Sequence, residues 1–214
     1  MSNSPVIAFL NKMTDLILLN VIWLLCCLPV VTAGAATTAA YYVSITSIRC
    51  GDGYVVKRFF SSFRKNFLQV TPVWIGVLLC SVILTVDMLF WYRQGTAFSK
   101  GMFIVSGIVC FLFLIWVLWL FPVFAKLDGK TGQLAKNAAA FAVGYLPYTA
   151  VLLVITGAAV YANLVSLVAN SIMLFIGFAV LFYVQSFFFY RVFMNHIDEK
   201  FDDFDYPEKI FPNE

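Results

Sequence analysis

Charged side chains are scarce in this chain. Only 12% of its 214 residues are Asp, Glu, Lys or Arg, whereas 62% are hydrophobic. An average soluble domain has about a quarter of its residues charged and about half of them apolar. The composition therefore excludes an ordinary soluble fold.

Residues that build catalytic and metal sites are also few. The one histidine, His196, cannot supply the His-Glu-x-x-His pair of a membrane metalloprotease. The five cysteines show neither metal-ligand nor disulfide spacing. The tripeptide Gly129-Lys130-Thr131 matches the end of a phosphate-binding loop, but Phe124 occupies the position of the first glycine. We therefore expect no catalytic residues, no cofactor, no metal ion and no nucleic-acid partner.

Long uncharged runs are what the chain has instead, and they cover residues 16–48, 66–86, 101–125 and 137–190. A helix needs about 20 apolar residues to cross the hydrocarbon of a bilayer, so the last run is long enough for two crossings. We predict an all-α, polytopic helical membrane protein with five or six transmembrane helices. The predicted helices cover about residues 16–28, 33–48, 71–91, 102–121, 147–168 and 171–190.

The first run is too long for one straight crossing. As a single helix its 33 residues would extend about 50 Å, well beyond the ~30 Å hydrocarbon core. Pro29 and Gly34 offer a break, and the Thr32 hydroxyl can accept a bond from a backbone N–H at the start of the second piece. The run is either one kinked crossing or a short, tight hairpin.

Basic residues are concentrated on one side of this predicted topology. Eleven of the fourteen fall in residues 49–69, in residues 122–136 and in the tail after residue 190. Lys and Arg accumulate in cytoplasmic loops, so we expect these three segments to be cytoplasmic in a multi-pass protein of a bacterial cell membrane. Lys12 changes side with the arrangement of the first run.

The start of the chain also fits a cleaved signal peptide, with a cleavage-like site at Ala33-Gly34-Ala35. Cleavage there would leave about 13 apolar residues before Arg49, and the most basic loop would then be exported. The preference of basic loops for the cytoplasm disfavours this alternative.

The segment of residues 54–70 has the pattern of an amphipathic helix. At 100° per residue, one arc is apolar and the opposite side carries the cations. We expect a helix in the cytoplasmic membrane interface, in contact with anionic headgroups; the alternative is that its apolar stripe docks a cytoplasmic partner. The candidate contact residues are Lys57, Arg58, Arg64, Lys65, Phe59, Phe60, Phe63 and Phe67, with Val56 and Val70 on the same apolar arc.

Two stretches, residues 24–45 (LLCCLPVVTAGAATTAAYYVSI) and 52–69 (DGYVVKRFFSSFRKNFLQ), resemble the YesL-like family of bacterial integral membrane proteins. That family is a domain of unknown function without established catalytic residues. Its members occur mainly in Gram-positive bacteria and are often encoded beside binding-protein-dependent sugar transporters and glycan-degrading enzymes. The resemblance implies a role near carbohydrate uptake and assigns no chemistry.

Four polar residues inside the predicted helices are candidates for an intramembrane site: Asp87, Asn163, Asn170 and Gln185. A carboxylate within a membrane is a functional candidate, but Asp87 lies near the helix end, where pairing with Arg93 or hydration is the favoured interpretation. For the three amides, bonding between helices is the favoured interpretation.

Small residues form a stripe in the second predicted helix, which indicates a close helix–helix interface. We expect this interface to form within the chain rather than with another protein. The stripe consists of Ala33, Gly34, Ala36, Thr37, Thr38, Ala40 and Ser44.

The predicted domain organisation is one transmembrane domain, residues 1–195, followed by an acidic cytoplasmic tail, residues 196–214. The tail contains seven of the eleven acidic residues. Tails of this composition are commonly solvated, and the alternative is that this one folds back onto the basic loop of residues 49–69.

The functional hypothesis is a non-enzymatic accessory or regulatory component of a bacterial carbohydrate ABC uptake system, in contact with the bilayer and with sugar permease subunits. The alternative is a stand-alone carrier of small solutes, whose path would be lined by the four intramembrane candidates. Transporters often have broken helices at their binding sites, and Pro29, Pro122 and Pro147 are positions for such breaks.

Overall fold

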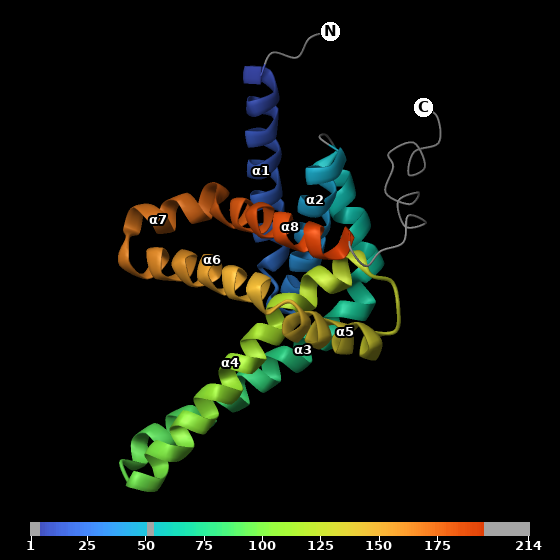
Figure 1. The fold of residues 1–214 in the computed structure, drawn as a ribbon. Helices are drawn as coiled ribbons and strands as arrows, with labels where there is room; N and C mark the ends of the chain where they lie inside the picture. The colour runs from blue at the N-terminus through green and yellow to red at the C-terminus, as the bar shows by residue number, and fades with distance from the viewer. Residues whose placement is uncertain (1–4, 51–53, 195–214) are drawn as a thin grey trace.

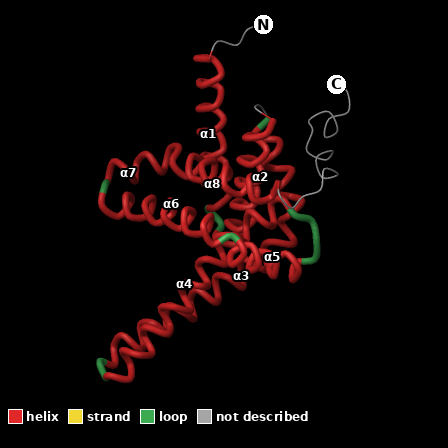
Figure 2. Tube along the Cα trace, in the orientation of Figure 1, coloured by secondary structure: helices red, strands yellow, loops and turns green. Residues whose placement is uncertain are grey.

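The computed structural model describes residues 5–50 and 54–194, and every regular element in this part of the chain is helical (Figures 1 and 2). Within these described residues, five helices are long and apolar enough to cross a membrane: Phe9–Cys27, Val55–Gln94, Ala97–Lys126, Leu146–Val165 and Leu167–Met194. The predicted all-α polytopic membrane fold is confirmed. The elements are α1 (Pro5–Cys27), a 3-10 turn (Val30–Thr32), α2 (Ala33–Cys50), α3 (Val55–Gln94), α4 (Ala97–Lys126), α5 (Thr131–Gly144), α6 (Leu146–Val165), α7 (Leu167–Ile172), a π-helical segment (Met173–Gly177) and α8 (Phe178–Met194).

The first apolar run folds as two helices rather than one. The chain turns at Pro29, and α2 lies back against α1, where Trp23 Nε1 donates a hydrogen bond to Thr37 Oγ1 at 3.3 Å (Figure 1). Two details differ from the prediction. Helix α1 begins at Pro5 instead of residue 16, and the Thr32 hydroxyl donates to the Pro29 carbonyl, 2.8 Å away, instead of accepting from a helix N–H.

Helix α2 is the centre of the molecule and packs against α1, α3, α4 and α8. Its small residues, including Ala35, Ala36 and Ala39, are completely buried. At Gly34 a Cβ atom would lie 2.6 Å from Trp74 Cβ of α3, so only glycine allows this approach of the two helices. The expected interface within the chain is confirmed. Since α2 is absent from the five long apolar helices, their number agrees with the lower of the two predicted counts.

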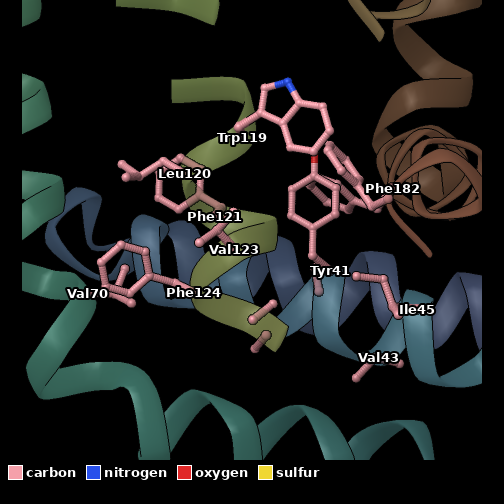
Figure 3. Close-up of a cluster of buried hydrophobic side chains, with 14 of the residues drawn as sticks. Tyr41, Val43, Ile45, Val70, Trp119, Leu120, Phe121, Val123, Phe124 and Phe182 are labelled. Carbon is pink, nitrogen blue, oxygen red and sulfur yellow. The ribbon is translucent and has the colours of Figure 1, made fainter. Parts of the chain in front are cut away.

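Aromatic side chains fill the space around α2. Tyr41 rises from α2 between Trp119 of α4 and Phe182 of α8 (Figure 3). The Tyr41 and Phe182 rings lie 4.9 Å apart in an edge arrangement, and Phe189 meets Trp119 at 5.1 Å. Such edge-to-face pairs add about 0.5–1.5 kcal/mol each beyond the area that they bury. The packing of α2, α4 and α8 is therefore specified by aromatic contacts as well as by small residues.

Helix α3 corrects the prediction of two separate helices in residues 54–91. It continues for 40 residues, about 60 Å, from the basic segment into the apolar one. Pro72 lies inside it and removes the N–H that would bond the Leu68 carbonyl. Leu68 is 85% exposed, so that carbonyl lies at the surface, and the helix continues through the proline.

Helices α3 and α4 form a long hairpin that extends away from the rest of the molecule (Figure 1). Gly95, with φ of +66°, makes the turn, and Thr96 Oγ1 caps α4 by accepting from the Ser99 N–H at 3.1 Å. The outer half of this hairpin comprises residues 78–94 of α3 and 97–118 of α4. Among its residues only Ser99 and Ser106 are buried.

The second half of the chain adds one helix that was not predicted and a second hairpin. Helix α5 follows the loop after α4, and its Leu134, Ala138 and Ala142 are buried. Their spacing of four residues could have indicated a helix, but Lys136 and Gly144 interrupt the apolar pattern. Helix α6 then pairs with the continuous helical stretch of α7, the π-helical segment and α8 (Figure 1).

Candidate functional site

The basic segment, defined here as residues 55–70, is the first part of α3. Lys57, Arg64 and Lys65 are exposed, as predicted for contacts with headgroups or a partner. Arg58 and Phe59, however, are only 4% and 0% exposed, which corrects the expectation that they take part in such contacts. The reason is that residues 55, 59, 62, 66 and 70 of α3 form the stripe buried in the molecule, so the segment is held by the protein as well as by any membrane.

The aromatic residues of the basic segment form a ladder along α3. Phe59 stacks on Phe63 with centroids 6.1 Å apart, and Phe63 meets Phe67 at 5.4 Å. Exposure rises from the buried Phe59 to the partly buried Phe63 and Phe67, and Phe60 is exposed. Phe60, Phe63 and Phe67 are therefore the part of the predicted apolar contact surface that remains accessible.

The loop between α4 and α5 fixes the basic segment from the side. Lys65 Nζ lies 3.0 Å from Asp128 Oδ1, and Gln69 Nε2 donates to the Gly129 carbonyl at 2.7 Å. Exposed ion pairs of this kind contribute about 0–1 kcal/mol each. Their value here is positional, because they join two of the three segments that the basic residues assign to one side of the membrane.

Arg58 is the residue whose environment sequence analysis missed. Its Nε and Nη2 atoms are buried and have no hydrogen-bond partner. The guanidinium cannot be deprotonated in a protein, and an unpaired buried charge is strongly unfavourable. The helical wheel places Arg58 beside the other cations, and no pattern in the sequence indicates that this part of the wheel is buried.

Asp87 lies in the α3–α4 hairpin and serves as a link between the two helices. Its Oδ1 accepts from Trp91 Nε1 at 3.0 Å, and its Oδ2 accepts from the Ser106 hydroxyl of α4. We expected pairing with Arg93 or hydration; the structure instead gives the carboxylate two neutral donors. This arrangement fixes the register of α3 against α4.

The other three intramembrane candidates do not gather around Asp87. Gln185 is buried, accepts from the Tyr41 hydroxyl at 2.5 Å and donates to Thr156 Oγ1 at 2.8 Å, so it joins α8 to α2 and α6. Asn163 donates to the Ala159 carbonyl of its own helix. Asn170 is exposed in α7. Of these three candidate amides, Gln185 is therefore the one whose hydrogen bonds join different helices.

Asn20 of α1 is a second residue that sequence analysis missed. It is completely buried, its Nδ2 donates to the Leu174 carbonyl at 2.7 Å, and its Oδ1 accepts from the Ala179 N–H at 3.0 Å. These backbone groups lie at the π-helical segment, where the regular helical bonding changes. Segments of this type often occur at functional sites. The asparagine is one polar residue in a long apolar run, which is why no periodicity identified it.

A groove of about 340 Å³ lies beside the π-helical segment, between α6 and the stretch from α7 to α8. Its lining is almost entirely apolar and includes Ile155, Ala159, Met173 and Val184. Asn163 contributes the one amide side chain of the lining. Within residues 5–50 and 54–194, no three His, Cys, Asp or Glu side chains come together as metal ligands.

The comparisons with known proteins agree with the predicted resemblance. The family model described as "Protein of unknown function, DUF624" matches residues 16–88, which confirms the resemblance to the YesL-like family. The matched stretch covers most of α1, the central helix α2, and α3 as far as Met88. No curated protein and no solved structure matches the chain.

Proposed function

Starting from the match of residues 16–88 to this family, we propose that the protein is a non-enzymatic accessory or regulatory component of a carbohydrate ABC uptake system in a bacterial cell membrane. Its partner in this proposal is a permease subunit of that system. The family's frequent occurrence beside sugar transporters motivates the choice of partner. The C-terminus and the basic segment are cytoplasmic in this arrangement, as the distribution of basic residues favours.

The observation that carries the proposal is the α3–α4 hairpin. Along its outer half the two helices contact each other, and apolar side chains such as Ile83, Ile104 and Leu112 are exposed. Helices associate in a bilayer through packing and interhelical bonds, so such a surface suits contact with the helices of a second membrane protein. Asp87 supports this use, because its bonds to Trp91 and Ser106 keep the hairpin in one register.

Copurification tests the proposal directly. The full chain, carrying an affinity tag, is isolated in mild detergent from the membranes of its native host, and the accompanying proteins are identified and quantified. We expect a sugar permease subunit in stoichiometric amount. Repeated isolation of the chain alone would refute the proposal.

The alternative function, a stand-alone carrier of small solutes, is favoured by one observation: the groove beside the π-helical segment contains the side chain of Asn163. The variant Asp87→Asn separates the two functions. An amide can still accept from Trp91 and bond to Ser106, so the hairpin is retained while the charge is lost. A carrier that couples transport to this carboxylate loses uptake in reconstituted liposomes, whereas an accessory protein transports nothing alone and keeps its permease.

A further inference from the structure

The groove beside the π-helical segment has two helical walls with several small side chains. The wall on the α7–α8 stretch runs from Ala169 to Val184 and includes Gly177. The lining residues of α6 recur every three or four positions, so they share one face of that helix; they are Ile155, Ala159, Ala162 and Asn163. A volume of about 340 Å³ lies within the usual size range of small-molecule sites.

The π-helical wall of the groove has a defined shape. Met173 Sδ lies against Gly177, in the space that a Cβ atom at residue 177 would need. On its other side the same segment is held by Asn20, which bonds to the Leu174 carbonyl and the Ala179 N–H. The absence of a side chain at residue 177 and the two bonds of Asn20 therefore fix this wall together.

The groove has a polar end and an apolar end. Its polar end lies at the turn between α6 and α7, where Asn163 lines the groove and Ser166 makes the turn (Figure 1). Tyr161 is 69% exposed near this turn, as is common for aromatic residues at a membrane interface. These residues place the polar end at the interface and the opposite end, at Ile155 and Val184, in the hydrocarbon.

The length of the groove matches the depth of one leaflet. At 1.5 Å per residue, its wall on α6 extends about 12 Å and the facing wall about 22 Å. Half of the ~30 Å hydrocarbon core is about 15 Å. At the inner end, Gln185 Nε2 donates to Thr156 Oγ1 at 2.8 Å and joins the two walls. An extended acyl chain that enters from the interface therefore fits the groove lengthwise.

The groove is open on its outer side. Ile172, Val180 and Val184 line it and are exposed as well. Both walls belong to helices that can cross a membrane, so this opening faces lipid. A polar solute fits the lining poorly, because a single amide would have to replace the hydrogen bonds that the solute makes to water.

The polar end selects an uncharged hydrogen-bond donor. Asn163 Nδ2 donates to the Ala159 carbonyl at 2.8 Å, and no donor in the described residues reaches its Oδ1. An amide oxygen accepts hydrogen bonds, so Oδ1 is left for a donor on the occupant. Residues 137–190 contain no charged side chain that could pair with a phosphate or an ammonium group. The matching donor is therefore a hydroxyl group.

We propose that this groove binds one acyl chain of an uncharged membrane lipid, and that a hydroxyl group of the lipid's polar region donates to Asn163 Oδ1. Diacylglycerol is the simplest lipid of this chemistry. The inference goes beyond the proposed function and does not depend on a permease.

The test uses a diacylglycerol that carries a photoreactive diazirine in the middle of one acyl chain. The full chain is placed with this probe in phosphatidylcholine nanodiscs, and mass spectrometry locates the labelled residues. Unlabelled diacylglycerol or phosphatidylglycerol with the same acyl chains is added as a competitor, in about tenfold excess over the probe.

Three variants accompany the wild-type protein. Ala159→Trp places a large side chain in the groove. The matched control, Ala158→Trp, places the same side chain at the neighbouring position, which is exposed and does not line the groove. Asn163→Leu removes the acceptor.

In the wild-type protein, we expect excess diacylglycerol to lower labelling of the groove about fivefold or more, and phosphatidylglycerol to lower it less than about twofold. Ala159→Trp should lower the labelling about fivefold or more, and Ala158→Trp less than about twofold. Asn163→Leu should lower it about threefold, the factor that an average hydrogen bond between membrane helices contributes.

Equal displacement of the probe by the two competitors would overturn the proposal, because the groove would then be an ordinary lipid-facing surface. Equal effects of Ala159→Trp and Ala158→Trp, or an absence of label from residues 155–184 of the wild-type protein, would overturn it too. The competition is read on the wild-type protein and so does not depend on the folding of a variant.

Discussion

Asn20 offers the clearest measure of how much a single buried polar side chain stabilises this fold. Replacement by leucine keeps the branched shape of the side chain but removes both hydrogen bonds, leaving the Leu174 carbonyl and the Ala179 N–H without their side-chain partner. A buried group left unsatisfied costs about 1–3 kcal/mol, although measured interhelical bonds in membranes average only about 0.6 kcal/mol. For two bonds, we expect Asn20→Leu to lower the free energy of unfolding by about 1–4 kcal/mol.

The matched control is Asn163→Leu. Asn163 bonds only to the Ala159 carbonyl of its own helix and is partly exposed, so its loss should change the unfolding free energy by less than about 0.5 kcal/mol. Both variants are compared with wild type by reversible unfolding in mixed micelles of lipid and denaturing detergent. If Asn20→Leu is no more destabilising than Asn163→Leu, the assigned role of Asn20 in supporting the π-helical segment is wrong.

Two further predictions concern the packing of α2. Gly34→Ala places a Cβ 2.6 Å from Trp74 Cβ and should destabilise the protein by about 1–3 kcal/mol. The control Gly76→Ala has open space around its Cβ and should be neutral or stabilising by up to about 1 kcal/mol. Equal thermal midpoints for the two variants would contradict the close approach of α2 and α3. Tyr41→Phe and Gln185→Leu remove the two ends of one buried hydrogen bond. A double-mutant cycle on their unfolding free energies should give a coupling of about 0.5–2 kcal/mol, and additive effects would show that the bond contributes nothing.

The helices of this protein were largely predictable because uncharged runs of about 20 residues have few alternatives to crossing a membrane. The stripe of small residues around Gly34 also predicted a close helix–helix interface, since close approach of backbones requires small side chains. The two breaks in the chain that matter most, at Pro29 and Gly95, lie where proline and glycine are expected to interrupt helices. Pro72 shows the limit of this rule, because a proline whose unpaired carbonyl lies at the surface leaves the helix intact.

The candidate site was less predictable because burial in this fold depends on contacts between distant segments. A helical wheel assigned Arg58 to the polar side, but in the fold this side chain is only 4% exposed. The same wheel could not show that Asp87 would find its partner in Ser106 on the next helix, or that Asn20 would bond to residues more than 150 positions away. A polar residue in an apolar run can be recognised from the sequence, but its hydrogen-bond partner can be found only in the tertiary structure.

The central claim is that the outer half of the α3–α4 hairpin contacts a permease, and site-specific photocrosslinking in native membranes tests it most directly. The crosslinker is placed at Ile104, an apolar residue of α4 on this hairpin that is 64% exposed, and at Leu167, an apolar residue of α7 on the other hairpin that is 85% exposed. The account predicts a crosslink to a sugar permease subunit from position 104 and none from position 167. Crosslinks from position 104 that reach only lipid, or equal crosslinking from both positions, would contradict it.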